Sequence, residues 1–283
     1  MIIVLIILAV IFDFLNGFHD SSNVVATPIS SGAIPPRRAL YMAAAAEFIG
    51  PFLFGVAVAT AVGEGLLDEE AITTSVVIAA LIGAIAWNII TWYFGLPSSS
   101  SHALIGGLIG AAVVESGVEA VKLAGLTRIV VALVVSPILG LVFGYLVMAA
   151  TLLASRSATL KINTTFRRAQ YFTLIGLALS HGTNDAQKTM GVITLGLLTA
   201  GLIDTFVVPI WVILICATAI ALGTALGGWR LIRTLGGKIF RIRPVHAFSS
   251  QIAGGTVIMG AALLGGPVST TQVMSTSIVG VGA

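Results

Sequence analysis

The stretch Gly17-Phe18-His19-Asp20-Ser21-Ser22-Asn23 has a counterpart in the second half of the chain, Gly182-Thr183-Asn184-Asp185-Ala186-Gln187-Lys188. In both stretches an aspartate follows a glycine by three residues. Further along, each half carries hydroxyl side chains behind a proline, at Pro97 to Ser101 and at Pro267 to Thr271. All four polar patches interrupt apolar sequence, so we expect two copies of one unit whose patches converge on a single site.

The composition is that of a membrane protein. Of the 283 residues, 57% are hydrophobic and 9% are charged, whereas about 25% of the residues of a soluble domain are charged. The single cysteine, Cys216, rules out an internal disulfide framework and a cysteine metal cluster. We expect no cofactor and no nucleic-acid partner for such a chain.

Apolar segments of about 20 residues or more, long enough to cross a bilayer, recur along the chain. They lie at 2–32, 39–62, 73–95, 127–154, 168–200, 207–227 and 246–265. We expect helix breaks near Gly17 and Gly182. Two shorter apolar runs, 102–114 and 272–283, follow the hydroxyl clusters. They are too short to span, so we expect arms of re-entrant hairpins or short partial helices buried in protein.

Basic residues set the predicted orientation. If the spans alternate, eleven of the fourteen fall on one side: Arg37, Arg38, Arg156, Lys161, Arg167, Arg168, Arg230, Arg233, Lys238, Arg241 and Arg243. The opposite loops carry Glu64, Asp68, Glu69, Glu70, Glu115, Glu119 and Asp204. Because cytoplasmic loops are enriched in lysine and arginine, we expect a multi-pass protein of the cell membrane with its N-terminus outside and its basic loops in the cytoplasm.

The same alternation makes the two halves enter the membrane from opposite sides. We therefore predict an all-α polytopic membrane protein built from inverted-topology repeats, with broken helices and re-entrant hairpin-like segments. The first repeat is 1–155 and the second is 156–283. The second has no counterpart of the span 127–154, so we expect that its last helix is missing by truncation.

The aspartates suit a small cation. Asp20 and Asp185, beside helices unwound at the glycines, would offer carboxylate oxygens together with free carbonyls. Asn23, Asn184 and Thr183 add neutral oxygens, and sodium is the metal expected at Asp20 and Asp185. The alternative is that both aspartates merely cap helices. A carboxylate in mid-bilayer costs about 2.5 kcal/mol or more, which favours a functional role.

The hydroxyl clusters suit an oxyanion. Ser99, Ser100 and Ser101 precede one short apolar run, and Ser269, Thr270 and Thr271 precede the other. A helix N-terminus with hydroxyl donors binds phosphate or sulfate without an arginine. A single cluster would be read as a loop with an N-cap, but its recurrence in the second half favours binding.

Glu47 and Lys188 are the remaining candidates for coupling. Glu47 lies in an alanine-rich span and is either a proton carrier or a structural acid bonded to a neighbouring helix. Lys188 stands where Asn23 stands in the first half, so it is a built-in cation, an anion ligand or, most plainly, the partner of Asp185. His102 adjoins a predicted ligand, whereas we expect packing roles for His19, His181 and His246.

These four motifs, Gly17 to Asn23, Pro97 to Ala103, Ser180 to Lys188 and Pro267 to Thr271, resemble the signatures of the inorganic phosphate transporter (PiT) family. The resemblance runs over essentially the whole chain. It implies an inverted-repeat fold, a homodimer, and symport of phosphate with sodium or protons. It also makes Asp20, Asn23, Asn184 and Asp185 cation or phosphate ligands, and both hydroxyl clusters phosphate ligands. Lys188 departs from the animal sodium-coupled pattern, which has asparagine there, and is similar to prokaryotic members.

We therefore predict a secondary active transporter that imports inorganic phosphate with a cation by alternating access, and that is not an enzyme. Asn23 and Asn184 belong to both the phosphate and the cation sets. Sulfate or metal-phosphate permeases of the same fold and an anion channel are the alternatives. A serine hydrolase using Ser101 and a histidine is disfavoured because no Gly-x-Ser-x-Gly motif surrounds either cluster.

Overall fold

The computed structural model describes residues 1–283 except 64, 68–71, 160 and 238–240, and within those residues it is helical without a regular strand. Five of the predicted loop charges, Glu64, Asp68, Glu69, Glu70 and Lys238, lie outside the described residues. The helices are α1 (Ile2–Ser30), α2 (Pro36–Leu53), α3 (Ala57–Gly63), α4 (Thr74–Phe94), α5 (Ser100–Ser116), α6 (Leu123–Ala154), α7 (Ile162–Thr199), α8 (Ile210–Leu226), α9 (Trp229–Gly237), α10 (Pro244–Leu263) and α11 (Thr270–Gly282).

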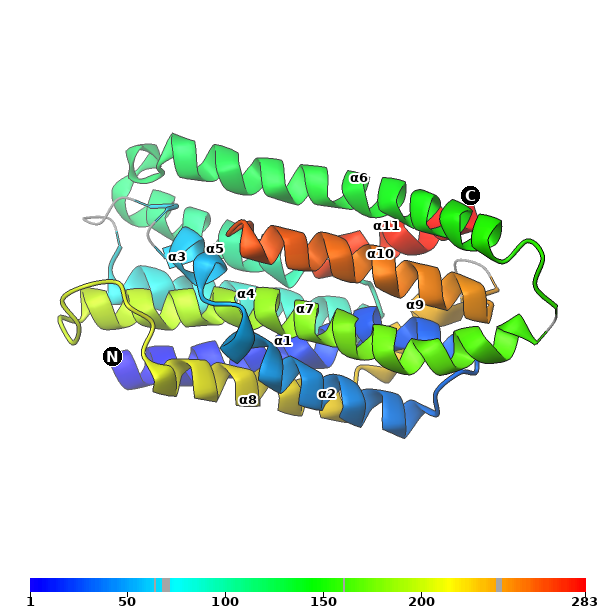
Figure 1. Ribbon diagram of the computed structural model, residues 1–283. Helices are drawn as coiled ribbons and strands as arrows, with labels where there is room; N and C mark the ends of the chain where they lie inside the picture. The colour runs from blue at the N-terminus through cyan, green and yellow to red at the C-terminus, as the bar shows by residue number, and fades with distance from the viewer. Residues whose placement is uncertain (64, 68–71, 160, 238–240) are drawn as a thin grey trace.

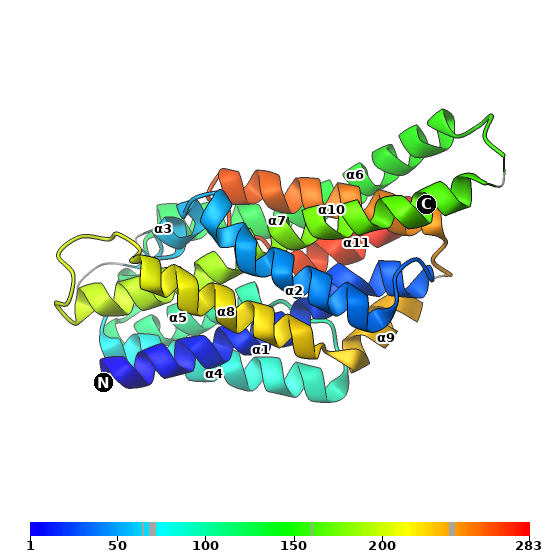
Figure 2. The same ribbon diagram turned by 60° about the horizontal axis from the view of Figure 1, so that its bottom comes forward.

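Both halves follow one order: a long helix, a bent helix pair and a helical hairpin. In the first half these are α1, α2 with α3, and α4 with α5, and α6 follows them; in the second they are α7, α8 with α9, and α10 with α11. The long helices α1 and α7 run in opposite directions (Figure 1). The halves interlock, because α2 packs on α7 and α8 packs on α1. Figure 2 shows the blue α2 beside the green α7 and the yellow α8 beside the dark blue α1.

Three of the described helices, α1, α4 and α6, are long and apolar enough to cross a membrane. The number rises to five if each bent pair counts as one span: α2 meets α3 at 77° and α8 meets α9 at 69°. The bends lie at Gly55 and Gly227, whose φ angles are +77° and +70°. Glycine has no Cβ and adopts this left-handed conformation freely, so it ends one helix and redirects the chain.

The predicted breaks at Gly17 and Gly182 are wrong, because α1 and α7 run through both positions as continuous helices. These glycines instead allow close contact between helices. A Cβ on Gly17 would lie 2.1 Å from the carbonyl oxygen of Ile220 on α8, and one on Gly182 would lie 2.4 Å from that of Glu47 on α2. Broken helices are present, as expected, but in the second element of each half and not in the first.

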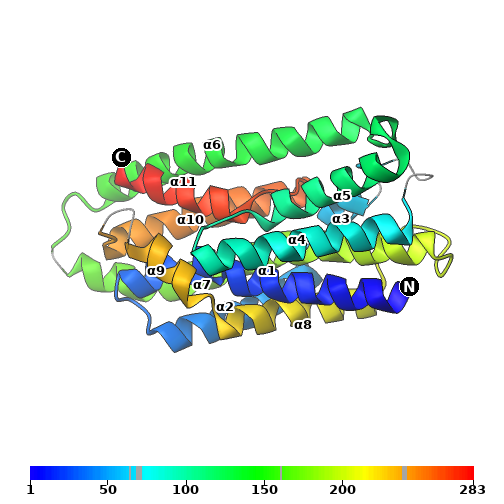
Figure 3. The same ribbon diagram turned by 180° about the vertical axis from the view of Figure 1, so that it is seen from behind.

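The two short apolar runs are helices, α5 and α11, each the second arm of a hairpin. Both begin near the middle of the molecule and run toward opposite ends (Figures 1 and 3). Ser99 and Ser269 are their N-caps, and each side chain accepts a hydrogen bond from the backbone amide three residues on. The fold thus points two capped helix N-termini at each other in the interior.

Candidate functional site

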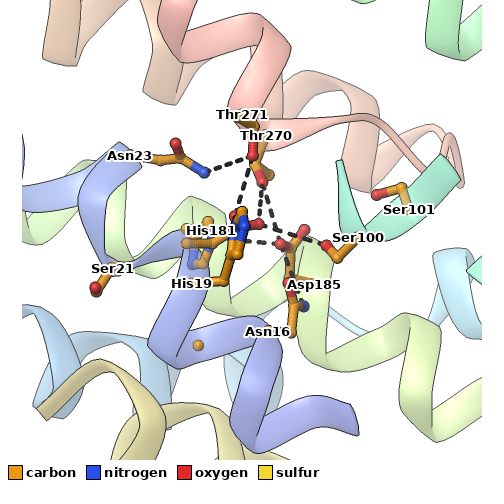
Figure 4. Close-up of polar contacts among 12 residues, drawn as sticks. Asn16, His19, Ser21, Asn23, Ser100, Ser101, His181, Asp185, Thr270 and Thr271 are labelled. Atoms are coloured by element: carbon orange, nitrogen blue, oxygen red, sulfur yellow. Dashed lines mark hydrogen bonds and ion pairs between the residues drawn. The ribbon is translucent and has the colours of Figure 1, made fainter. Parts of the chain in front are cut away.

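The four sequence patches meet at one buried cluster, shown in Figure 4. Asp20 of α1 and Asp185 of α7 are 1% and 0% exposed. The hydroxyl of Thr270, at the start of α11, lies 3.2 Å from Asp20 Oδ2 and 3.1 Å from Asp185 Oδ2. One hydroxyl carries one hydrogen, so both carboxylates share a single donor and their oxygens face the same small space.

The Asp20 carboxylate collects hydroxyl donors from both hairpin tips. Thr271 Oγ1 donates to its Oδ1 at 3.0 Å, and Ser100 Oγ approaches its Oδ2 at 3.5 Å. His19 Nδ1 lies 3.2 Å from Oδ1. Because Ser100 belongs to α5 and Thr271 to α11, this carboxylate ties the two opposed hairpins together.

Lys188 is the partner of Asp185, the plainest of the roles considered for it. Its Nζ lies 2.5 Å from Asp185 Oδ1, 2.6 Å from Ser101 Oγ and 3.0 Å from the carbonyl oxygen of Val268. All three hydrogens of the ammonium therefore have acceptors. Ser101 also donates to Val268 O at 2.8 Å, so the lysine holds α7 against the tips of both hairpins.

Asn23 and Asn184 each offer one free oxygen. Asn23 Nδ2 donates to Thr271 Oγ1 at 2.9 Å, and Asn184 Nδ2 donates to the carbonyl oxygen of Gly266 at 3.1 Å. The Oδ1 atoms of both asparagines are buried and have no hydrogen-bond partner. Unpaired buried acceptors are uncommon, and both asparagines are bonded through Nδ2 to residues of the second hairpin tip.

Thr183, predicted as a cation ligand, faces away from this cluster. Its hydroxyl donates to the carbonyl oxygen of Leu179 at 2.7 Å and lies against Gly50 of α2. Because α7 is continuous, residues 181, 185 and 188 share one face at the spacing of 3.6 residues per turn, and residue 183 lies on the opposite face. Ser99 and Ser269, the first members of the hydroxyl clusters, are engaged as N-caps, the alternative that the sequence left open for them.

His181 is the main residue that the sequence analysis missed. We expected a packing role, but its Nε2 lies 3.2 Å from Asp185 Oδ2 and 4.0 Å from Asp20 Oδ2, and its Nδ1 lies 3.0 Å from Glu47 Oε1. The contact atoms of Asp20, His181 and Asp185 all lie within 4.8 Å of one another, close enough to hold one cation. Its spacing of four residues before Asp185 was the available signal, since it puts both side chains on one helix face.

Glu47 reaches the cluster through His181. Its other oxygen, Oε2, accepts a hydrogen bond from Thr224 of α8 at 2.5 Å, and Thr224 also bonds the carbonyl oxygen of Gly17 at 3.1 Å. Glu47 thus joins α2, α7 and α8 as a structural acid would, and it also faces an ionisable ring. His102 does not reach the carboxylates, because its Nδ1 bonds Ser99 Oγ at 2.8 Å.

The buried charges do not balance. Among the described residues four carboxyl groups are buried, those of Asp13, Asp20, Glu47 and Asp185, together with one amine, that of Lys188. The imidazoles of His19 and His181 are the other buried ionisable groups of the cluster. Even with both imidazoles protonated, the carboxylates exceed the cations by one, so the interior attracts cations or protons.

A cavity of about 580 Å³ leads to this cluster between α4, α5 and α11. Its lining includes Trp87, Ser98, Ser99, His102, Thr271 and Gln272. Thr271 bonds Asp20 and so marks the inner end of the cavity. Neither carboxylate lines the cavity itself, so Thr271 is the link between the cavity and the cluster.

Residues 16–160 and 151–283 match the phosphate transporter family. A probable low-affinity inorganic phosphate transporter of Bacillus subtilis (strain 168) is 45% identical over 285 residues, which cover 99% of this chain and 85% of the relative. One from Rhizobium meliloti (strain 1021) is 44% identical over 281 residues, covering 99% and 84%. The chain belongs to the phosphate transporter family.

This phosphate transporter family member also matches a solved structure, described as the sodium-dependent phosphate transporter, with a TM-score of 0.88. At 24% identity, covering 99% of this chain and 89% of the other, the match establishes the shared fold. The family consists of transporters and not enzymes, which removes the hydrolase reading of Ser101. The apolar helices and bent helix pairs of this chain are those of a multi-pass membrane protein.

Proposed function

We propose that this chain imports inorganic phosphate across the cell membrane by symport with a cation, sodium or a proton, through alternating access. The observation that carries the proposal is the buried meeting of two hydroxyl-bearing helix N-termini with two carboxylates that lack full charge compensation. The relatives named above, at 44–45% identity and each called a probable low-affinity inorganic phosphate transporter, support phosphate as the anion.

Asp20 and Asp185 are the proposed cation ligands. Their Oδ2 atoms face each other through Thr270. The buried, unpaired Oδ1 atoms of Asn23 and Asn184 are the proposed neutral ligands. Carboxylate and amide oxygens can replace the water shell of sodium, and a carboxylate can instead take a proton. The site needs no cofactor, since both substrates are ions.

Phosphate would bind between the two helix N-termini. Ser100, Ser101, Thr270 and Thr271 are its proposed hydroxyl donors, assisted by the amides of Asn23 and Asn184 and by the free backbone amides of α5 and α11. In the structure these hydroxyls bond the carboxylates and Val268. They must therefore turn from the acids to the anion when it binds, which makes the acids available to cations.

Electrostatics makes cation and anion binding cooperative. A negative charge about 4 Å from an uncompensated carboxylate is repelled by about 4 kcal/mol at an effective dielectric constant of 20. This is about a thousandfold in affinity. Cations that neutralise Asp20 and Asp185 remove this penalty, and by linkage phosphate then raises the affinity for cations equally.

Alternating access is supported by the closed form of the site. Asp20, Asp185, Ser101 and Thr270 are each exposed by 1% or less, so solute must reach and leave them through a rearrangement. The hairpins approach from opposite ends of the molecule (Figures 1 and 3), so withdrawal of one tip at a time would open one side at a time. The N-terminus outside, the basic loops in the cytoplasm and the homodimer expected from the family complete the proposal.

Uptake of radiolabelled phosphate into proteoliposomes tests the proposal, with sodium and pH gradients imposed separately. We expect accumulation against a phosphate gradient, driven by at least one of the two ions and not displaced by equal sulfate. Asp20→Asn and Asp185→Asn should lower uptake and its cation dependence together, whereas Asp204→Asn, an exposed loop acid, should change neither. Uptake that only follows the phosphate gradient would indicate a channel and refute symport.

A further inference from the structure

Asp13 is a buried acid that none of the four patches contains. It lies on α1 two helical turns before Asp20, with an exposed fraction of 0%. The spacing Asp13, Asn16, Asp20, Asn23 places all four side chains along one face of the helix. The corresponding position of α7, seven residues before Asp185, is Ala178, so only one half of the fold carries this acid.

The Asp13 carboxylate is only partly satisfied. Its Oδ1 accepts a hydrogen bond from Thr189 of α7 at 2.9 Å, but its Oδ2 has no hydrogen-bond partner. Asn16, one turn further along α1, is similar: its Nδ2 approaches Asp185 Oδ2 at 3.5 Å while its Oδ1 is unpaired. Two unpaired oxygens, both fully buried, therefore lie one turn apart on the same helix face.

No permanent cation among the described residues pairs with Asp13. On α7 the ionisable groups that act on it are Asp185, Lys188 and His181, and on α8 it is the Cys216 thiol beside the carboxyl. Lys188 is held by Asp185 at 2.5 Å, and none of these groups is within ion-pair distance of Asp13. The neighbouring helix α4, Thr74–Phe94, contains no charged residue. An unpaired carboxylate in such surroundings favours neutralisation by a bound cation or proton.

We propose that Asp13 and Asn16 form a second cation subsite, distinct from the Asp20 and Asp185 centre, which takes one monovalent cation, either sodium or a proton. Sodium would be bound by Asp13 Oδ2 and Asn16 Oδ1; a proton would reside on Asp13 Oδ2 and be donated to Asn16 Oδ1. Asn16 touches Asp185, so the subsite is linked to the centre. This inference rests on the proposed function, since the subsite supplies a coupling ion.

Proteoliposomes containing the full chain test the subsite with two readouts. Gradient-driven phosphate uptake needs the coupling ions, whereas exchange of internal for external phosphate at equal ion concentrations does not need net movement of them. Asp13→Asn keeps the shape and removes the charge, so we expect gradient-driven uptake to fall at least tenfold while exchange stays within about threefold of wild type. Asp204→Asn, which removes a carboxylate from an exposed loop, should leave both rates unchanged.

The ion is identified by applying the sodium and pH gradients separately to the wild type and to Asp13→Asn. If Asp13→Asn removes the response to sodium, the subsite binds sodium; if it removes the response to pH, the subsite binds a proton. If Asp13→Asn responds to both gradients as strongly as the wild type does, Asp13 is only structural and the subsite is overturned. The cation role of the Asp20 and Asp185 centre is tested separately by the uptake of Asp185→Asn. Absence of phosphate transport by the wild-type chain would refute the proposed function itself.

If Asp13→Asn folds poorly, Thr189→Val provides the test, because it removes one hydrogen-bond donor to Asp13 and no charge. We expect it to keep exchange and to change the half-saturating concentration of the coupling cation by about threefold or more. An unchanged half-saturating concentration would also overturn the subsite.

Discussion

Asp185→Asn should destabilise the folded chain more than Asp20→Asn, although both remove one buried carboxylate. The difference is the ammonium of Lys188, whose Nζ lies 2.5 Å from Asp185 Oδ1. Asp20 contacts hydroxyls and imidazoles but no lysine or arginine. Removing the charge of Asp185 therefore leaves a buried cation without its counter-ion, whereas removing that of Asp20 weakens only its hydrogen bonds with hydroxyls and imidazoles.

The magnitude follows from the burial of the pair. Asp185 is 0% exposed and Lys188 is 2% exposed, so neither charge is screened by solvent. Breaking a buried ion pair on one side costs about 3–5 kcal/mol. Ser101 and the carbonyl of Val268 remain as acceptors for Lys188, which places the expected loss near the lower end, about 3 kcal/mol. For Asp20→Asn we expect a smaller loss of about 1–2 kcal/mol, because its donors lose a charged acceptor but no buried ammonium is left unpaired.

The assay is thermal unfolding of the purified protein in detergent, followed by tryptophan fluorescence. At about 2–4 °C per kcal/mol for a chain of this size, Asp185→Asn should lower the midpoint by about 6–12 °C. The double variant Asp185→Asn with Lys188→Met removes both charges and should recover most of this loss, because a buried pair replaced by neutral groups is often neutral or stabilising. Equal losses for Asp20→Asn and Asp185→Asn, or no recovery in the double variant, would refute this account.

Two further predictions use matched pairs of variants. Thr270→Val removes the hydroxyl shared by the two carboxylates. It should raise the KM for phosphate in the uptake assay about tenfold or more, since a hydrogen bond to a charged group contributes about 1.5–3 kcal/mol. Thr183→Val, on the opposite face of α7, should leave this KM unchanged. Gly182→Ala places a methyl group 2.4 Å from the Glu47 carbonyl oxygen and should destabilise by about 1–3 kcal/mol, measured by thermal unfolding. Gly176→Ala, on the same helix with nothing within 4 Å, should be neutral or stabilising by up to about 1 kcal/mol, and equal effects of the two alanines would contradict the packing role of Gly182.

The position of the hairpin tips was predictable because it depends on local chemistry. A proline ends one arm, and the hydroxyl cluster that follows it caps the next helix, as Ser99 and Ser269 do. The recurrence of this pattern, together with the repeated Gly-x-x-Asp, predicted which patches belong together. The face on which each side chain lies was not predictable, because it depended on whether α1 and α7 break at their glycines.

The placements of His181 and Thr183 follow from the continuity of α7. With a broken helix, Thr183 would be free to turn toward the carboxylates; with a continuous one, it faces Gly50 of α2 while His181 faces Asp185. The continuity is itself a tertiary effect, because Gly17 and Gly182 are each pressed against the backbone of a helix from the other half. The sequence of one repeat contains no information about which helix of the other half lies against it.

The sequence by itself determined the membrane environment, the two related halves and the identity of the polar groups, because these follow from composition and from patterns within about 20 residues. Only the tertiary structure decided which of those groups meet. Asp20, Ser100, Asp185 and Thr270 come from four different helices, and their contacts depend on how α1, α7 and the two hairpins interlock. That interlocking is set by helix packing over the whole molecule, and local sequence cannot specify it.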